Sequence, residues 1–323
     1  MIAYHASHEQ FAPSRLLRLT QAAELSGFDA IHSSDHFHPW SVRQGESGFA
    51  FSWVASVLQA TKLPVSMVCA PGQRYHTAIV AQAIATLAEM YPGRYSVELG
   101  SGEALNEMIT GTTWPSKQIR NERLKESAHV IRKLLNGQQV TFHGHINIKN
   151  AKLYTLPAKQ PALFCAAISE QTAAWAGEWA DGLLTTAGKM QDVLKKKEQF
   201  EMGGGKDKPV RLQFSFSYGH DREAAIDGAY DQWRTNIIGT DKLGDLSTPQ
   251  QFDNLAEKIT KEEIAEKVPI YTNINAVIDH AQEYLRNGFQ MVTLHNVNTN
   301  QEQFVEDFGK VYKKTLPAAR SFN

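Results

Sequence analysis

The chain has 323 residues, 42% of them hydrophobic, and 33 Lys and Arg against 34 Asp and Glu give a formal net charge of −1. This balance provides no long-range attraction to nucleic acid or an anionic membrane, and the hydrophobic fraction excludes a disordered chain. The polar N-terminus, the lack of a long apolar run and two isolated cysteines predict a cytoplasmic enzyme with a small-molecule substrate. A homodimer is one option for its assembly.

Short β-rich segments alternate along the chain with amphipathic helical segments, the order typical of parallel α/β folds. We expect eight strands, at 2–6, 29–33, 65–70, 94–100, 162–167, 182–186, 211–218 and 290–295. Helices are expected at 14–25, 49–61, 76–90, 117–135, 169–179, 189–200, 222–233, 275–286 and 301–313. A hairpin over 138–156, with Gly144 at its tip, and an insertion over 236–269 interrupt the alternation. Insertions of this length usually line or cover a binding site.

Eight strand–helix repeats fit a closed barrel better than an open doubly wound sheet. A dinucleotide-binding sheet would place G-x-G-x-x-G after its first strand, whereas this chain continues with His5-Ala6-Ser7-His8. We therefore expect an α/β fold, a single TIM-type (β/α)8 barrel domain over 1–323 with long loop insertions. Asp35, Glu103, Ala166 and Thr185 should then all reach one mouth of the barrel.

Catalytic groups of such barrels project from the C-terminal ends of the strands. The titratable residues that fall at those ends are His5, His8, Asp35, His36, His38, Glu103, Glu107, Lys189, His220 and His295. Small residues separate them on the third to fifth strands, which leaves room for a flat ring. Taken singly, the histidines could be surface or capping residues, and Gly100-Ser101-Gly102 could be an ordinary strand-to-helix turn.

Four segments carry a resemblance to a known family: SSDHFHPW at 33–40, APGQRYH at 70–76, YPGRYSVELGSGEALNE at 91–107 and DGLLTTAGK at 181–189. They resemble the luciferase-like flavin and deazaflavin (F420) oxidoreductases, particularly the F420-dependent glucose-6-phosphate dehydrogenase group. Within that group the chain is most similar to a branch of flavinoid oxidoreductases that does not use F420. The resemblance implies an oxidoreductase or monooxygenase with FMN as cofactor, and coenzyme F420 as the alternative. The alternative function is an F420-dependent sugar-phosphate or alcohol dehydrogenase.

The resemblance also implies catalytic roles. His36 would be the base that removes a hydroxyl proton, Glu103 the acid that protonates the reduced cofactor, and Trp40 a wall of the substrate side. A histidine titrates in the range that suits such a base, and burial can adapt a carboxyl group to act as an acid. Asp35 would lie beside the cofactor ring and Asn106 would hold the cofactor.

The rest of the implied cofactor site is mostly backbone and small side chains. The residues that would form the cradle of the ring are Ala70, Ser101, Gly102, Ala166 and Ala167, with a strained cis peptide bond at Met67–Val68 behind it. In a barrel, Arg120, Arg123 and Ser169 are placed to meet the cofactor's phosphate, through guanidinium contacts and a helix N-terminus.

The chain departs from the sugar-phosphate dehydrogenases where they bind the phosphate with three basic side chains. Lys189 matches the first of these basic side chains. The second position falls on Glu266, with Lys267 adjacent, and the third falls on His280. Lys189 and His280 remain the expected substrate residues, and glucose 6-phosphate is disfavoured. The alternative from another class is a metal-dependent barrel hydrolase using His36 and His38 with His5, Glu103 or His295. An inactive cofactor-binding subunit is a third option.

Overall fold

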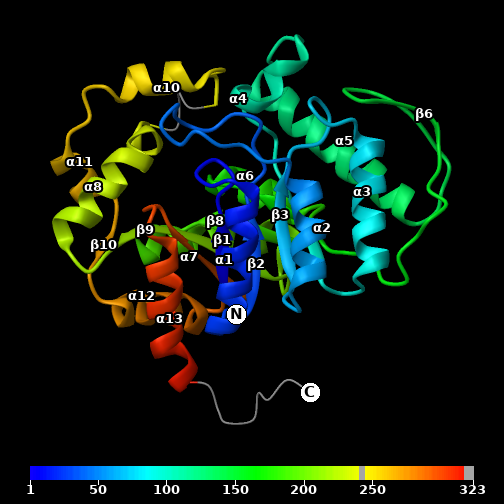
Figure 1. The fold of residues 1–323 in the computed structure, drawn as a ribbon. Coiled ribbons are helices and arrows are strands. Elements are labelled where there is room, and N and C mark those ends of the chain that lie inside the picture. Colours follow the sequence, from blue (N-terminus) through cyan, green and yellow to red (C-terminus); the bar gives the residue numbers. More distant parts are fainter. Residues whose placement is uncertain (240–243, 316–323) are drawn as a thin grey trace.

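Eight parallel strands close into a barrel in the computed structural model, which describes residues 1–239 and 244–315 (Figure 1). The barrel strands are β1 (Ile2–Ala6), β2 (Ala30–Ser33), β3 (Val65–Cys69), β4 (Tyr95–Leu99), β7 (Leu163–Ala166), β8 (Gly182–Thr186), β9 (Val210–Tyr218) and β11 (Met291–Asn296). Pairing of β8 with β9 closes the ring, and β10 (Ile270–Tyr271) extends it beside β9. The expected TIM-type barrel is confirmed.

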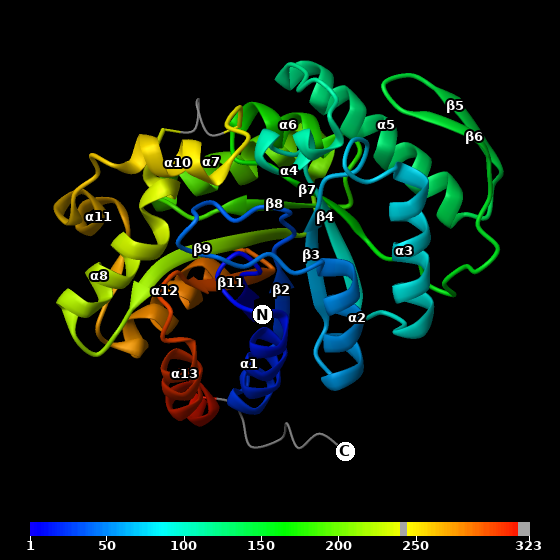
Figure 2. The same ribbon diagram turned by 45° about the horizontal axis from the view of Figure 1, so that its top comes forward.

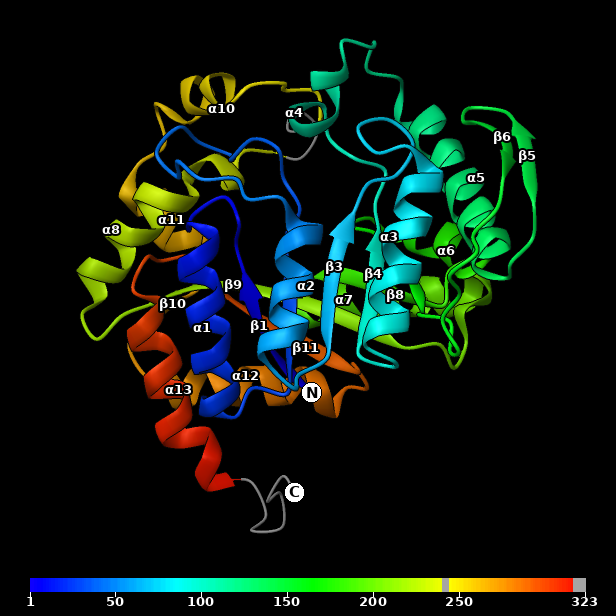
Figure 3. The ribbon, with the colours of Figure 1, turned by 45° about the vertical axis from the view of Figure 1, so that its right-hand side comes forward.

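Helices surround the barrel on its outer side (Figures 1 and 3). They are α1 (Pro13–Ser26), α2 (Ala50–Ala60), α3 (Thr77–Met90), α5 (Lys117–Leu135), α6 (Glu170–Gly177), α7 (Met190–Phe200), α8 (Arg222–Trp233), α12 (Ile274–Arg286) and α13 (Gln301–Thr315). Each lies within two residues of its expected bounds. Among the described residues, no helix is both long and apolar enough to cross a bilayer.

The expected hairpin and insertion are both present. Strands β5 (Val140–His143) and β6 (Asn147–Ala151) form the hairpin, which lies beside α5 (Figure 2). A Cβ on Gly144 would come within 2.6 Å of the Glu126 carboxylate, which accepts the backbone N–H groups of His145 and Ile146. The tip therefore requires glycine. The insertion contains α10 (Pro249–Ala256) and α11 (Lys261–Lys267), while its residues 240–243 lie outside the described part.

The barrel lumen is unusually polar. Along each strand one face packs into the hydrophobic core between strands and helices, as Tyr4, Ile31 and Leu294 do. The alternate face, which points into the lumen, carries His5, His32, Ser66, Glu98, Arg211, Gln213, Thr293 and His295, all well buried except the half-buried Gln213. Lumens of such barrels are usually filled by Val, Ile and Leu. This one therefore holds charged and titratable groups beneath its mouth.

The prediction of a cis peptide bond at Met67–Val68 is wrong. All described peptide bonds are trans. Met67 and Val68 pair in unbroken parallel register with Val97 and Glu98 of β4, which a cis bond in the middle of β3 would disrupt. The Met67 side chain is fully buried in the core, on the face of β3 opposite the lumen.

Three of the four residues expected at one mouth follow or end their strands as predicted, and Thr185 does not. Asp35 comes two residues after β2, Glu103 lies at the start of the short helix α4 (Ala104–Glu107) after β4, and Ala166 ends β7. Thr185 is the last residue but one of β8, yet it shares the helix-facing side of that strand with Leu183. Its side chain is thus turned away from the lumen.

Candidate active site

Asp35 is held in a buried network at the mouth. One oxygen, Oδ2, accepts from Arg74 Nη2 at 2.8 Å, and Oδ1 accepts from the hydroxyl of Tyr75 at 2.9 Å. Arg74 also contacts the buried carboxylate of Glu107, with Nε 3.4 Å from Oε1. Burial raises the pKa of Asp35, and the Arg74 guanidinium opposes that rise. Arg74 is therefore the cation that both carboxylates share, a role that the sequence did not single out.

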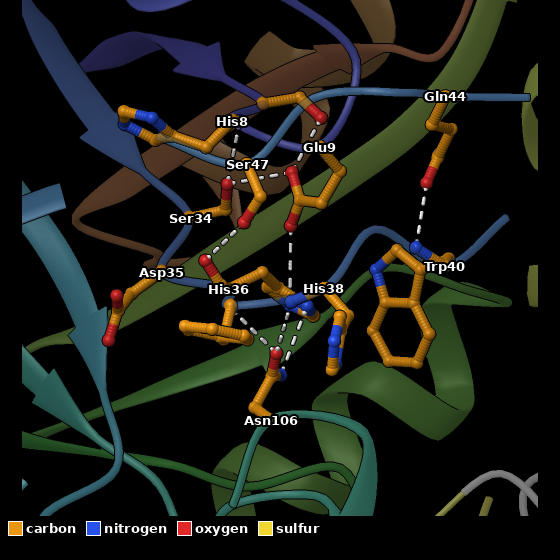
Figure 4. Close-up of polar contacts among 12 residues, drawn as sticks. His8, Glu9, Ser34, Asp35, His36, His38, Trp40, Gln44, Ser47 and Asn106 are labelled. Atoms are coloured by element: carbon orange, nitrogen blue, oxygen red, sulfur yellow. Dashed lines mark hydrogen bonds and ion pairs between the residues drawn. The ribbon is translucent and has the colours of Figure 1, made fainter. Parts of the chain in front are cut away.

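His36 uses both ring nitrogens within the protein (Figure 4). Nε2 lies 3.2 Å from Glu9 Oε1, and Nδ1 lies 3.1 Å from Asn106 Nδ2. Asn106 Oδ1 accepts the backbone N–H groups of Phe37 and His38, which turns its NH2 group toward His36. His36 Nδ1 therefore accepts from Asn106, and Nε2–H donates to Glu9.

Glu9 is a site residue that the sequence interpretation missed. Its Oε2 accepts from the hydroxyls of Ser7 and Ser34, both at 2.8 Å. Burial alone would raise the pKa of Glu9, but His36, the backbone and these hydroxyls outweigh it and lower the pKa. A carboxylate three residues after the first barrel strand was the available signal, since that position lies at the mouth.

Trp40 and α10 form an aromatic wall next to His36. The ring centroids of His36 and Trp40 are 4.9 Å apart, and Trp40 meets Phe252 edge to face at 5.4 Å. Gln44 Oε1 accepts the backbone N–H of Trp40 at 2.9 Å and fixes the loop (Figure 4). Since the buried Phe252 belongs to the insertion, the insertion supports Trp40 from behind.

Glu103 lies at the N-terminus of α4, on the other side of the mouth. Burial raises its pKa, and the nearby carboxylates of Glu9 and Glu107 add to the rise while His36 opposes it. A carboxyl group with a raised pKa can donate a proton near neutral pH. The environment of Glu103 therefore suits the acid role predicted for it.

The expected cradle is a group of small, mostly part-exposed residues where β3, β4 and β7 end. Ala70, Gly100, Ser101, Gly102 and Ala166 remain partly exposed, while Ala167 is buried. A Cβ on Gly100 would have only the Cβ of Ala166, at 4.0 Å, as a described neighbour within that distance. Gly102 has φ +78°, and a Cβ there would lie 2.9 Å from Glu107 Cγ. The small side chains of this group are what the predicted cradle requires.

The expected phosphate residues lie on α5 and at the N-terminus of α6. Arg120 stacks on the Trp114 ring at 4.5 Å, and its Nη1 lies 3.8 Å from Asp245 Oδ1. Arg123 Nη1 donates to Gln73 Oε1 at 2.6 Å. Ser169 caps α6 by accepting the backbone N–H of Thr172 at 3.2 Å. Whether these groups bind a phosphate stays a prediction.

Lys189 and His280 do not form a cluster of cations. Lys189 is exposed at the start of α7, and Glu266 is exposed on α11. His280 stacks on Tyr284 at 5.0 Å and contacts the Tyr271 hydroxyl through Nδ1 at 2.8 Å. Burial lowers the pKa of His280, which disfavours the charge that a phosphate would need.

The metal-hydrolase alternative lacks a ligand set. Within 1–239 and 244–315, no three His, Cys, Asp or Glu side chains are arranged to hold a metal ion. His36 and His38 diverge: the first contacts Glu9, whereas His38 Nδ1 lies 2.8 Å from the backbone oxygen of Leu105.

The closed barrel carries histidines, carboxylates and a group of small residues at one mouth, as expected for a barrel enzyme with its active site there. Comparison with known proteins identifies its family. Residues 2–291 match the model of the luciferase-like monooxygenase family. The chain belongs to this family, and the expectation of a luciferase-like oxidoreductase is confirmed.

The chain is similar over nearly its whole length to proteins named F420-dependent glucose-6-phosphate dehydrogenase. That of Tsukamurella paurometabola is 31% identical, with 98% of both chains covered, and that of Nakamurella multipartita is 31% identical, with 98% and 96% covered. Among solved structures, an F420-dependent secondary alcohol dehydrogenase with an F420–acetone adduct has 29% identity and a TM-score of 0.88, covering 98% and 99%. EDTA monooxygenase from Chelativorans sp. BNC1, at 13% identity and a TM-score of 0.71, covering 98% and 94%, shares the fold.

Proposed function

We propose that this protein oxidises a neutral alcohol to a carbonyl compound with coenzyme F420 as hydride acceptor. The observation that carries the proposal is a mouth with a histidine–carboxylate pair and an aromatic wall. Among the described residues, the positions expected for a substrate phosphate do not form a cluster of cations. The relatives at 29–31% identity are named as F420-dependent dehydrogenases.

The described residues fit a flavin-type cofactor. Small residues leave space for the ring, and Arg120 Nε is buried with no hydrogen-bond partner in the described part of the chain. A buried donor without a partner costs free energy, which an anionic ligand would recover. The sequence favoured FMN over F420. The similarity favours F420, which we therefore propose, with FMN as the alternative.

When bound, the deazaflavin supplies the hydride acceptor, and the protein supplies orientation and proton transfer. Asp35, fixed by Arg74 and Tyr75, would position the ring edge. Glu103 would provide the proton that the reduced ring takes up. The Glu9–His36 pair and Trp40 would orient the alcohol and limit the access of water.

A neutral substrate follows from the residues around the mouth. The positions that would bind a sugar phosphate are the isolated Lys189, the acidic Glu266 and the aromatic-packed His280, which could not neutralise a dianion together. Trp40, which packs edge to face on the buried Phe252, offers apolar surface instead. A small secondary alcohol fits this wall better than a phosphorylated sugar.

Equilibrium titration of the protein with F420 and with FMN tests the cofactor assignment, followed by mixing the F420 complex with propan-2-ol. We expect tighter binding of F420, and reduction of the bound deazaflavin only when alcohol is present. Arg123→Met should weaken binding of F420 while leaving binding of its phosphate-free riboflavin-level chromophore unchanged. Tight FMN binding with no F420 binding would contradict the proposal.

A further inference from the structure

A chain of polar side chains crosses the barrel lumen and ends at His5. Arg211 Nη1 donates to Glu98 Oε1 at 2.7 Å, and Glu98 Oε2 lies 3.9 Å from His32 Nε2. His32 Nδ1 in turn lies 2.8 Å from His5 Nδ1. The side chains of Glu98 and His32 are fully buried, whereas His5 keeps 6% exposure at the C-terminal end of β1. The chain thus leads from the closed part of the lumen to the floor of the mouth.

The contacts fix which nitrogens carry protons. His32 Nε2 and Glu98 Oε2 have no hydrogen-bond partner in the described residues, so a proton on His32 Nε2, facing the carboxylate, is the favourable arrangement. A neutral His32 then accepts at Nδ1, and His5 must donate from Nδ1. His5 Nε2 is therefore left with a free lone pair.

The free lone pair distinguishes His5 from His36. In this structure His36 accepts from Asn106 at Nδ1 and donates to Glu9 from Nε2, so it must break a contact before it can take a proton. His5 Nε2 needs no such rearrangement. A base requires an available lone pair within reach of the proton that it removes.

We propose that His5 is a catalytic proton acceptor in the alcohol oxidation, an assignment that rests on the proposed function. The carbinol C–H bond breaks, its electron pair leaves as hydride to the deazaflavin ring, and the O–H proton moves to His5 Nε2 as the C=O bond forms. The charge that develops on His5 is stabilised through His32 by Glu98. His32 and Glu98 are positioning residues that act through His5.

Several titratable groups surround His5. His32 on β2 and His295 on β11 flank it, with the His5 and His295 rings 4.1 Å apart. His8 after β1 and His36 after β2 complete the set of imidazoles that act on its charge. Burial, followed by these neighbours, lowers the pKa of His5, so the ring is neutral and able to accept a proton at neutral pH.

Single-turnover reduction of F420 by excess propan-2-ol tests the assignment. It is measured from about pH 9 down to about pH 4, because the pKa of His5 lies well below the usual value for histidine. His5→Asn should slow reduction by roughly 10²–10⁴-fold at neutral pH and leave the Kd of F420 unchanged. It should also abolish the fall in rate toward acid pH, which His36→Asn should retain. His8→Asn, a buried histidine of the same segment bonded to Ser33, is the matched control and should behave as wild type.

A His5→Asn rate close to that of wild type, or loss of the acid limb in His36→Asn alone, would overturn the assignment. Should His5→Asn not fold, His32→Asn replaces it: its amide oxygen still accepts from His5, but the link to Glu98 is lost. Its acid limb should move to lower pH, and an unmoved limb counts against the proposal. A wild type without turnover would refute the proposed function instead.

¹⁵N NMR of the His5 and His32 tautomers then decides the assignment, and a proton on Nε2 of neutral His5 would refute it.

Discussion

Arg74→Met should be among the most destabilising single changes in the candidate site. The Arg74 side chain is 7% exposed and sits between the carboxylates of Asp35 and Glu107, whose side chains are 1% and 2% exposed. Methionine keeps much of the volume but leaves two buried carboxyl groups without their shared cation. Loss of one partner from a buried ion pair typically costs about 3–5 kcal/mol. We expect a loss of this size in the free energy of unfolding at pH 8.

The loss should be smaller at acid pH. Burial already raises the pKa values of Asp35 and Glu107, and removing Arg74 raises them further. The folded variant then binds more protons than the unfolded chain, so its stability falls as pH rises. Urea unfolding at about pH 5.5 and 8 measures both effects, with Arg15→Met as control because its pair with Glu302 is exposed and worth about 1 kcal/mol or less. An Arg74→Met variant as stable as Arg15→Met at both pH values would refute the reasoning.

Three further predictions concern the mouth and the lumen. Glu103→Gln should keep F420 affinity while slowing reduction by roughly 10²–10⁴-fold, and an unchanged single-turnover rate would exclude it as the acid. Asp245→Asn should tighten F420 binding in a fluorescence titration, because Asp245 faces the guanidinium of Arg120; the affinity for the phosphate-free chromophore should stay the same. Burial lowers the pKa of His295 to about 3 and of His8 to about 4, so the unfolded chain takes up protons first. Stability should therefore fall as pH drops below about 6.5, and His8→Asn should flatten the dependence of the urea midpoint on pH.

Much of the fold could be predicted because the helix and strand patterns of the individual segments agreed with the order expected for a barrel. Strand and helix patterns alternated eight times, and several helices ended at glycines such as Gly27 and Gly288, which adopt positive φ. The motifs around His36 and Glu103 could be placed at one mouth, since parallel strands bring their C-terminal ends together. Met67–Val68 shows the limit: the motif match implied a cis bond, whereas the bond is trans and β3 pairs with β4 in unbroken register.

The missed residues act through contacts between segments distant in sequence. Glu9 reaches His36 because β1 and β2 pair in parallel. Its position after β1 indicates the mouth, but not the contact with His36. His5 was placed at the mouth from the sequence, but its contact with His32 forms only because the closed barrel turns both side chains into the lumen. His280 matched a phosphate-binding position, yet the packing of α12 engages its ring with Tyr271 and Tyr284. Such placements depend on side-chain direction and register, which a single sequence does not specify.

Transfer of deuterium from the alcohol to the cofactor tests the central claim most directly. The protein is mixed without oxygen with F420 and propan-2-ol deuterated at the carbinol carbon, and the reduced cofactor is analysed by mass spectrometry. Direct hydride transfer at this mouth predicts one deuterium in the reduced deazaflavin and an equal amount of acetone. Glucose 6-phosphate should give no reduction under the same conditions. Reduction by glucose 6-phosphate but not by the alcohol, or a reduced cofactor free of deuterium, would contradict the account.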